Sequence, residues 1–256
     1  TCSYLIITYK IPGKNLWNTW IYSGLLGSII FVISGCFLAY AWGFALNPNL
    51  KFIKSRNFNF WILGTLTLLA ILMVIWHDFG GYGNNLLIIK IPKLKPTLFK
   101  FCKALAPGLQ EEMVRYLSIL IFLFSFRHLK NKLPLTIIWS ALIFGLLHLS
   151  NLDIHSLSST LYQAITAFTL GLFLAVLYLY SGKLWLPIFI HFLLNYLLYI
   201  KAGSFQNIFW SGTSNDWLNL LLHLLVPTAI TIWIMFGKRR QVMEENANRL
   251  ILKTQN

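Results

Sequence analysis

Long apolar runs separated by short polar stretches dominate this sequence. A helix that crosses the hydrocarbon core of a bilayer needs about 20 mostly apolar residues. By this measure the pattern predicts seven membrane-spanning helices. They cover residues 17–46, 58–76, 106–126, 133–149, 158–180, 185–200 and 217–236. We therefore expect an all-α protein, folded as a multi-pass transmembrane helical bundle in one membrane-embedded domain.

The composition supports a membrane protein. Hydrophobic residues make up 57% of the 256 residues and charged residues only 11%, whereas a soluble domain has about 25% charged residues. This balance excludes a soluble globular domain and a disordered chain. The three cysteines form no C-x-x-C pair, so they indicate neither a disulfide framework nor a cysteine-based zinc site.

The basic residues, 21 Lys and Arg against 7 Asp and Glu, lie between the apolar runs. A nucleic-acid-binding protein carries such an excess on the solvated face of a soluble fold, so nucleic acid is not an expected partner. The positive-inside rule instead places cationic loops on the cytoplasmic side. With seven spans, the loops after the first and third spans and the C-terminus share that side. Their cations are Lys51, Lys54, Arg56, Arg127, Lys130, Lys132, Lys238, Arg239 and Arg240.

One loop conflicts with this topology. Residues 77–105 lie on the predicted outer side, yet they contain five lysines. A re-entrant or interfacial piece at residues 86–91, which are too few to span a bilayer, could lie here. The count of spans would then be eight.

Ionisable side chains inside the apolar runs are the candidates for chemistry, because each is costly in a bilayer unless it is paired or hydrated. Glu111 and Glu112 are adjacent, and Arg115 follows them. On a helix Arg115 can pair with one carboxylate, while the other faces a cavity and serves as a general base. The alternative is structural: Pro107 and Gly108 precede the pair, and acidic residues favour the first turn of a helix.

Two histidine motifs lie on later spans. His148 ends the sequence Phe144-Gly-Leu-Leu-His148, and His191 lies four residues before Asn195. An imidazole can move a proton, orient water or bind a metal. The spacing of His191 and Asn195 puts two donors on one helix face, as an oxyanion hole needs. The structural alternatives are an interfacial histidine bonded to backbone and polar contacts between helices.

These three motifs together resemble the CPBP family of CAAX proteases and bacteriocin-processing enzymes, also called the Abi family. The resemblance lies in a Glu-Glu pair with a following Arg, then Phe-x-x-x-His, then His-x-x-x-Asn, and covers about residues 104–198. It implies an all-helical membrane fold with a polar intramembrane cavity. It also implies an intramembrane endopeptidase that cuts peptide bonds near the membrane.

The resemblance also implies a role for each site residue. Glu111 (or Glu112) and His148 would activate water, and His191 and Asn195 would stabilise the oxyanion. Arg115 would hold the remaining carboxylate, and Phe144 of the second motif would support the site.

One departure from the family pattern leaves the base open. The family has Glu-Glu-x-x-x-Arg, whereas only two residues separate Glu112 from Arg115. Aligned on the arginine, Glu111 matches the Arg-paired glutamate, and Gln110 takes the catalytic position. Aligned on the pair, Glu111 is the base and Arg115 holds Glu112 from three residues away; we favour this alignment.

No metal cofactor is favoured, but zinc is a possible one. Glu111, His148 and His191 are of the residue types that bind catalytic zinc, and the same three can act without metal.

We thus expect three regions: N-terminal spans and a basic loop (1–105), a CPBP-like catalytic core (106–237), and a polar basic tail (238–256) that forms a solvated, amphipathic cytoplasmic extension. The substrate would be a peptide or lipidated protein in the lipid bilayer, and the location a bacterial plasma membrane. The alternative function is a weak or inactive bacteriocin self-immunity or scaffold protein that acts by binding.

Overall fold

The computed structural model describes residues 16–44, 57–79, 93–200 and 210–251, and these ranges contain helices and no β-strand. The helices are α1 (Leu16–Tyr22), α2 (Leu25–Ala41), α3 (Phe60–Phe79), α4 (Leu98–Ser125), α5 (Lys132–Leu147), η1 (His148–Asp153), α6 (Leu157–Ser181), α7 (Trp185–Ile200), α8 (Ser214–Ile234) and α9 (Gly237–Ile251). The predicted all-α fold is therefore confirmed. Lys51, Lys54, Arg56, Lys90, the piece at 86–91 and the end of the tail lie outside the described ranges.

Helices lie at all seven predicted spans, but two of the spans differ from the prediction. The span predicted at 17–46 is two helices, α1 and α2, bent by 66° at their junction. Gly24 lies at this bend with a φ of +79°, a left-handed conformation that glycine adopts without steric cost. The helix predicted to begin at residue 106 begins at Leu98 as α4, because the Thr97 side chain accepts a hydrogen bond from the backbone N–H of Lys100 and caps it.

Fewer than seven of the described helices are long and apolar enough to cross a membrane. Three helical segments of the described ranges are long and apolar enough to cross a membrane: Lys132–Asp153, Leu157–Ser181 and Asp216–Ile234. The bent pair α1 and α2 would be a fourth. Helix α4 has 28 residues but carries charged residues near its middle, while α3 and α7 offer shorter apolar segments. Seven or eight spans are therefore not confirmed.

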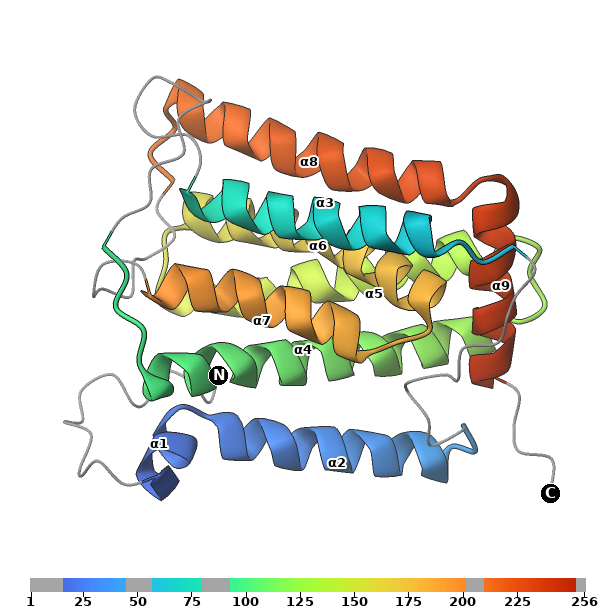
Figure 1. The fold of residues 1–256 in the computed structure, drawn as a ribbon, viewed down its shortest axis with the longest axis horizontal. Coiled ribbons are helices and arrows are strands. Elements are labelled where there is room, and N and C mark those ends of the chain that lie inside the picture. Colours follow the sequence, from blue (N-terminus) through green and yellow to red (C-terminus); the bar gives the residue numbers. More distant parts are fainter. Residues whose placement is uncertain (1–15, 45–56, 80–92, 201–209, 252–256) are drawn as a thin grey trace.

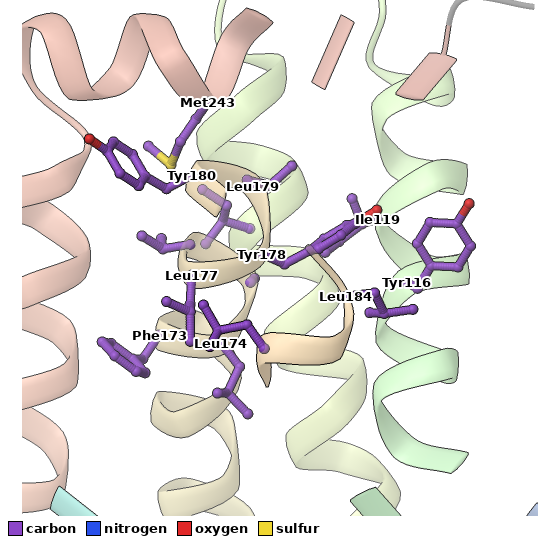
Figure 2. Packing of buried hydrophobic residues seen from close by; sticks show 14 of the residues in the cluster. Tyr116, Ile119, Phe173, Leu174, Leu177, Tyr178, Leu179, Tyr180, Leu184 and Met243 are labelled. Carbon is purple, nitrogen blue, oxygen red and sulfur yellow. The ribbon is translucent and has the colours of Figure 1, made fainter. Parts of the chain in front are cut away.

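Helix α6 is the centre of the bundle. It packs against α5, α7, α8, α9 and α3, and residues 172–181 are all buried. A helix that is apolar on every side is typical of a protein core or of a membrane span, and this end of α6 lies in the core. Figure 2 shows this end of α6, with Leu174, Leu177 and Leu179 packed among side chains of neighbouring helices.

Helix α9 crosses the end of the bundle, roughly perpendicular to the long helices (Figure 1). Its buried residues include Val242, Met243 and Ala247. The Asn246 side-chain amide donates hydrogen bonds to the carbonyls of Leu179 and Tyr180, at 2.8 and 3.1 Å. These carbonyls belong to the last turn of α6, where a helix lacks internal partners. The tail was expected to be a solvated extension; its described part is amphipathic, as expected, but it packs against the bundle.

Candidate active site

Glu111 and Glu112 lie near the middle of α4 rather than at its start. The helix begins at Leu98, and Pro107 is inside it, so more than three turns of helix precede the two glutamates. The stabilisation of acidic residues at a helix N-terminus falls off within the first turn. The structural alternative considered for this pair, two acids in a first helical turn, is therefore wrong.

Arg115 pairs with Glu112 and not with Glu111. Its Nε donates to Glu112 Oε2 at 2.8 Å, and its Nη2 donates to Oε1 at 3.0 Å. Both side chains are buried, at 1% and 0% exposure. A two-bonded arginine–carboxylate pair of this kind is geometrically specific. It occupies both oxygens of Glu112 and leaves Glu111 without a cation on its own helix turn.

His191 of α7 extends this pair into a chain of three residues. Its Nδ1 lies 2.9 Å from Glu112 Oε1, and because a carboxylate only accepts, Nδ1 carries the hydrogen. The three linked side chains, Arg115, Glu112 and His191, are called the Arg–Glu–His chain below. With Nδ1 committed to Glu112, the remaining ring nitrogen of His191, Nε2, is the one available for chemistry.

Glu111 lies at the open end of this chain. Its Oε2 is 3.6 Å from His191 Nε2, and its side chain is 32% exposed. Among the described residues, this buried Oε2 atom has no hydrogen-bond partner. A separation of 3.6 Å is too long for a direct hydrogen bond. At this distance a water molecule can bridge two polar atoms. The two carboxylates therefore differ: Glu112 is buried and paired, and Glu111 is partly accessible.

Phe144 of α5 connects the second motif to the chain. The centre of the Arg115 guanidinium lies 3.9 Å from the centroid of the phenyl ring, a cation–π contact. The same ring meets His191 edge-on at 5.9 Å and His148 at 5.0 Å, centroid to centroid. Phe144 thus touches three of the polar residues that the sequence analysis selected.

His148 contacts the ring of Phe144 and the backbone of the same residue. Its Nδ1 donates to the backbone carbonyl of Phe144 at 2.9 Å, since a carbonyl only accepts. This bond leaves Nε2 as the nitrogen that is free to accept from water. No interaction in the described ranges joins His148 to Glu111 or Glu112, so their expected cooperation on one water remains a prediction.

Asn195 lies one turn after His191 on α7 and is half-buried. None of the interactions found within the described ranges involves its side chain. Its expected role as a second oxyanion donor therefore also remains a prediction.

Two glycines that the sequence analysis did not select allow the helices to approach closely here. A Cβ at Gly108 would lie 3.2 Å from the backbone nitrogen of Phe192, the residue after His191, and one at Gly145 would lie 2.9 Å from the carbonyl of Ala164. Small residues at such positions let helix backbones come close. Each glycine lies three residues before a candidate residue, Glu111 or His148, and this spacing was a signal the sequence already contained.

The possible zinc ligands do not form a metal site in this structure. In the part of the chain that is described, no group of three or more His, Cys, Asp and Glu side chains is placed to hold a metal ion. Glu111, His148 and His191 are included in that search, and His191 Nδ1 is bonded to Glu112.

Residues 93–197 match the family of type II CAAX prenyl endopeptidase Rce1-like proteins. The resemblance to CAAX proteases is confirmed over this segment. The Rce1-like segment extends from just before α4 into α7 and contains every site residue named above. Comparisons with curated proteins and with solved structures gave no match. The matched family is one of endopeptidases, and the described residues include helices that are long and apolar enough to cross a membrane.

Proposed function

We propose that the protein is an intramembrane endopeptidase of the CAAX-protease type that hydrolyses a peptide bond with a water molecule activated by Glu111. The observation that carries this proposal is the contrast between the two glutamates. Glu112 is held by Arg115 and His191, whereas Glu111 Oε2 is a buried acceptor that has no hydrogen-bond partner among the described residues and lies 3.6 Å from His191 Nε2.

In the proposed reaction, Glu111 accepts a proton from the water as its oxygen attacks the scissile carbonyl. The carbonyl becomes a tetrahedral oxyanion, which needs donors fixed in advance. His191 Nε2, when it carries a proton, and the amide of Asn195 are the proposed donors, and His148 Nε2 orients the water. Glu111 then transfers its proton to the leaving nitrogen as the C–N bond breaks, so that the carboxylate is restored.

The Arg–Glu–His chain has a supporting role in this scheme. Glu112 holds the ring of His191 in one orientation, with Nδ1 protonated and Nε2 toward Glu111. Arg115 supplies the positive charge that a fully buried carboxylate requires. The chain therefore fixes one wall of the site before substrate binds.

The proposed substrate is a peptide or lipidated protein in the bilayer, since the matched family is one of CAAX prenyl endopeptidases. The proposed location is a bacterial plasma membrane with α9 on the cytoplasmic side. Lys132, the first residue of α5, donates to Asn248 of α9, so the start of α5 and the basic helix α9 lie at one end of the bundle.

The test uses the purified protein in lipid nanodiscs and two peptides that end in a CAAX sequence, one prenylated and one not. Glu111, Glu112, His148 and His191 are replaced singly by alanine, and cleavage and folded yield are followed. Cleavage by the wild type that is lost in Glu111→Ala at normal yield supports the proposal. Unchanged cleavage in Glu111→Ala contradicts the proposal. Absence of cleavage of either peptide by the wild type also contradicts it, and would favour the alternative function, self-immunity or scaffolding by binding. Metal content and chelator sensitivity test the zinc alternative.

A further inference from the structure

Gly171 of α6 lies against the guanidinium of Arg115. A Cβ built on Gly171 would be 2.9 Å from Arg115 Nη1, 3.1 Å from the Cα of Ala141 and 3.2 Å from its Cβ. Real Cβ atoms essentially never come as close as 2.9 Å to another heavy atom. Gly171 is buried within α6, so a side chain there could not turn toward solvent.

We propose that Gly171 is a positioning residue for the active site: its missing side chain leaves the room in which Arg115 holds Glu112 and, through Glu112, His191. This inference rests on the proposed function and adds to it a residue from α6, a helix that contributes none of the motif residues.

The guanidinium has little freedom to move away from a side chain at position 171. Nε and Nη2 are both bonded to Glu112, and the ring of Phe144 lies 3.9 Å from the centre of the group. The third nitrogen, Nη1, is buried without a hydrogen-bond partner in the described residues. A methyl group pressed against Nη1 would therefore displace the guanidinium from Glu112 or lift it off Phe144.

The second neighbour of Gly171 is backbone, which cannot turn aside. The Cα of Ala141 belongs to α5, and α5 and α6 are in extensive contact. A methyl at position 171 therefore cannot avoid Arg115 Nη1 by moving toward α5 unless the two packed helices separate. Moving the end of one side chain requires less rearrangement than separating two helices. We therefore expect Arg115 to move.

Gly64 provides a matched control. It is also inside an apolar helix, α3, but no atom lies within 4 Å of a Cβ built there. Alanine is a better helix former than glycine, so Gly64→Ala should leave the fold and the site unchanged. Any effect of glycine replacement as such would appear in both variants, and an effect of the close contact only in Gly171→Ala.

The first measurement does not depend on catalysis. With ¹⁵N-labelled histidine in detergent micelles, the Nδ1–H signal of His191, identified by its loss in His191→Gln, reports the hydrogen bond to Glu112. The signal should shift or broaden in Gly171→Ala and be unchanged in Gly64→Ala. An unchanged signal in Gly171→Ala overturns the proposal. If the signal shifts but the wild type cleaves nothing, the proposed function fails and the positioning role stands.

The second measurement is a double-mutant cycle on cleavage. Gly171→Ala should lower kcat about 10²-fold, the loss that a displacement of about 1 Å can cause, with KM little changed. In an Arg115→Lys background, which lacks Nη1, Gly171→Ala should have less than about a twofold further effect, because the coupled partner is gone. An equal loss in both backgrounds would assign the effect to Ala141 and overturn the proposal.

If Gly171→Ala yields no folded protein, the Arg115→Lys/Gly171→Ala double variant decides. Recovery of the folded yield seen with Arg115→Lys alone supports a clash with Arg115. Failure of the double variant to fold, where Arg115→Lys alone folds, places the clash in the helix packing and overturns the proposal.

Discussion

Glu112 accepts a hydrogen bond from His191 across 79 residues of sequence, and the same carboxylate accepts two more from Arg115, which is only three residues away. One contact is local to α4, and the other joins α4 to α7. Glu112 thereby links the first motif to the third by a hydrogen bond. Four predictions test this arrangement and the packing around it.

Replacing Glu111 by glutamine should abolish most of the catalysis without destabilising the fold. Its side chain is partly accessible, and the neighbouring Arg115 pairs with Glu112 instead, so the loss of Glu111 does not leave Arg115 buried without its partner. General-base catalysis contributes about 10²- to 10⁴-fold to rate, and kcat should fall by that amount. Steady-state cleavage and thermal unfolding check this. Glu245→Gln, an exposed change on α9, is the control; a Glu111→Gln enzyme that retains full kcat would contradict the assignment of the base.

Replacing Glu112 by alanine should instead destabilise the protein. Arg115 would remain buried without its partner, and removal of one member of a buried ion pair costs about 3–5 kcal/mol. A large drop in the thermal unfolding midpoint, together with loss of cleavage, is therefore expected. The comparison with Glu111→Ala is decisive: if the two variants unfold at the same temperature, the glutamates do not have the separate roles described here.

Replacing Phe144 by leucine should weaken the support of Arg115 while keeping an apolar side chain in place. Cation–π contacts contribute about 0.5–2 kcal/mol. The substitution removes the aromatic ring whose centroid lies 3.9 Å from the centre of the Arg115 guanidinium. We expect a modest loss of stability and a lower kcat. Phe189→Leu, at an exposed position on α7, is the matched control, and equal behaviour of the two variants would show that the contact has no role.

Replacing Asn246 by alanine should loosen α9 from the bundle. The carbonyls of Leu179 and Tyr180 would lose their partner, and an unsatisfied buried polar group costs about 1–3 kcal/mol. Limited proteolysis should then cut between α8 and α9 faster than in the wild type, and the unfolding midpoint should fall. Glu245→Ala, at an exposed position of α9, serves as the comparison; indistinguishable proteolysis of all three proteins would mean that Asn246 does not hold α9.

Helix α4 shows how far local reasoning extends. The spacing predicted that Arg115 pairs with one of the two glutamates, and in the structure that glutamate is Glu112. The predicted start of this helix, residue 106, was wrong. Pro107 and Gly108 are residues that often mark a helix boundary. Eight residues and a cap at Thr97 precede Ala106 in the structure, and the helix continues through the proline.

Helix α9 shows the converse. Its amphipathic pattern was visible, but a polar segment with one apolar face is compatible both with a solvated extension and with a docked helix. Whether the segment docks depends on a surface that can receive its apolar face. That surface includes the end of α6, more than sixty residues earlier in the chain.

The apolar runs, the low content of charge and the three motifs determined by themselves that the protein is helical, suited to a bilayer and similar to CAAX proteases. These properties depend on composition and on spacings of three or four residues, which a helix converts directly into neighbouring side chains. The tertiary structure decided which nitrogen of His191 is bonded to Glu112, that Phe144 touches Arg115 and His191, and that Gly171 lies against a guanidinium. Such contacts join segments far apart in the chain, and their existence depends on distances of a few ångströms between packed helices, which no local pattern specifies.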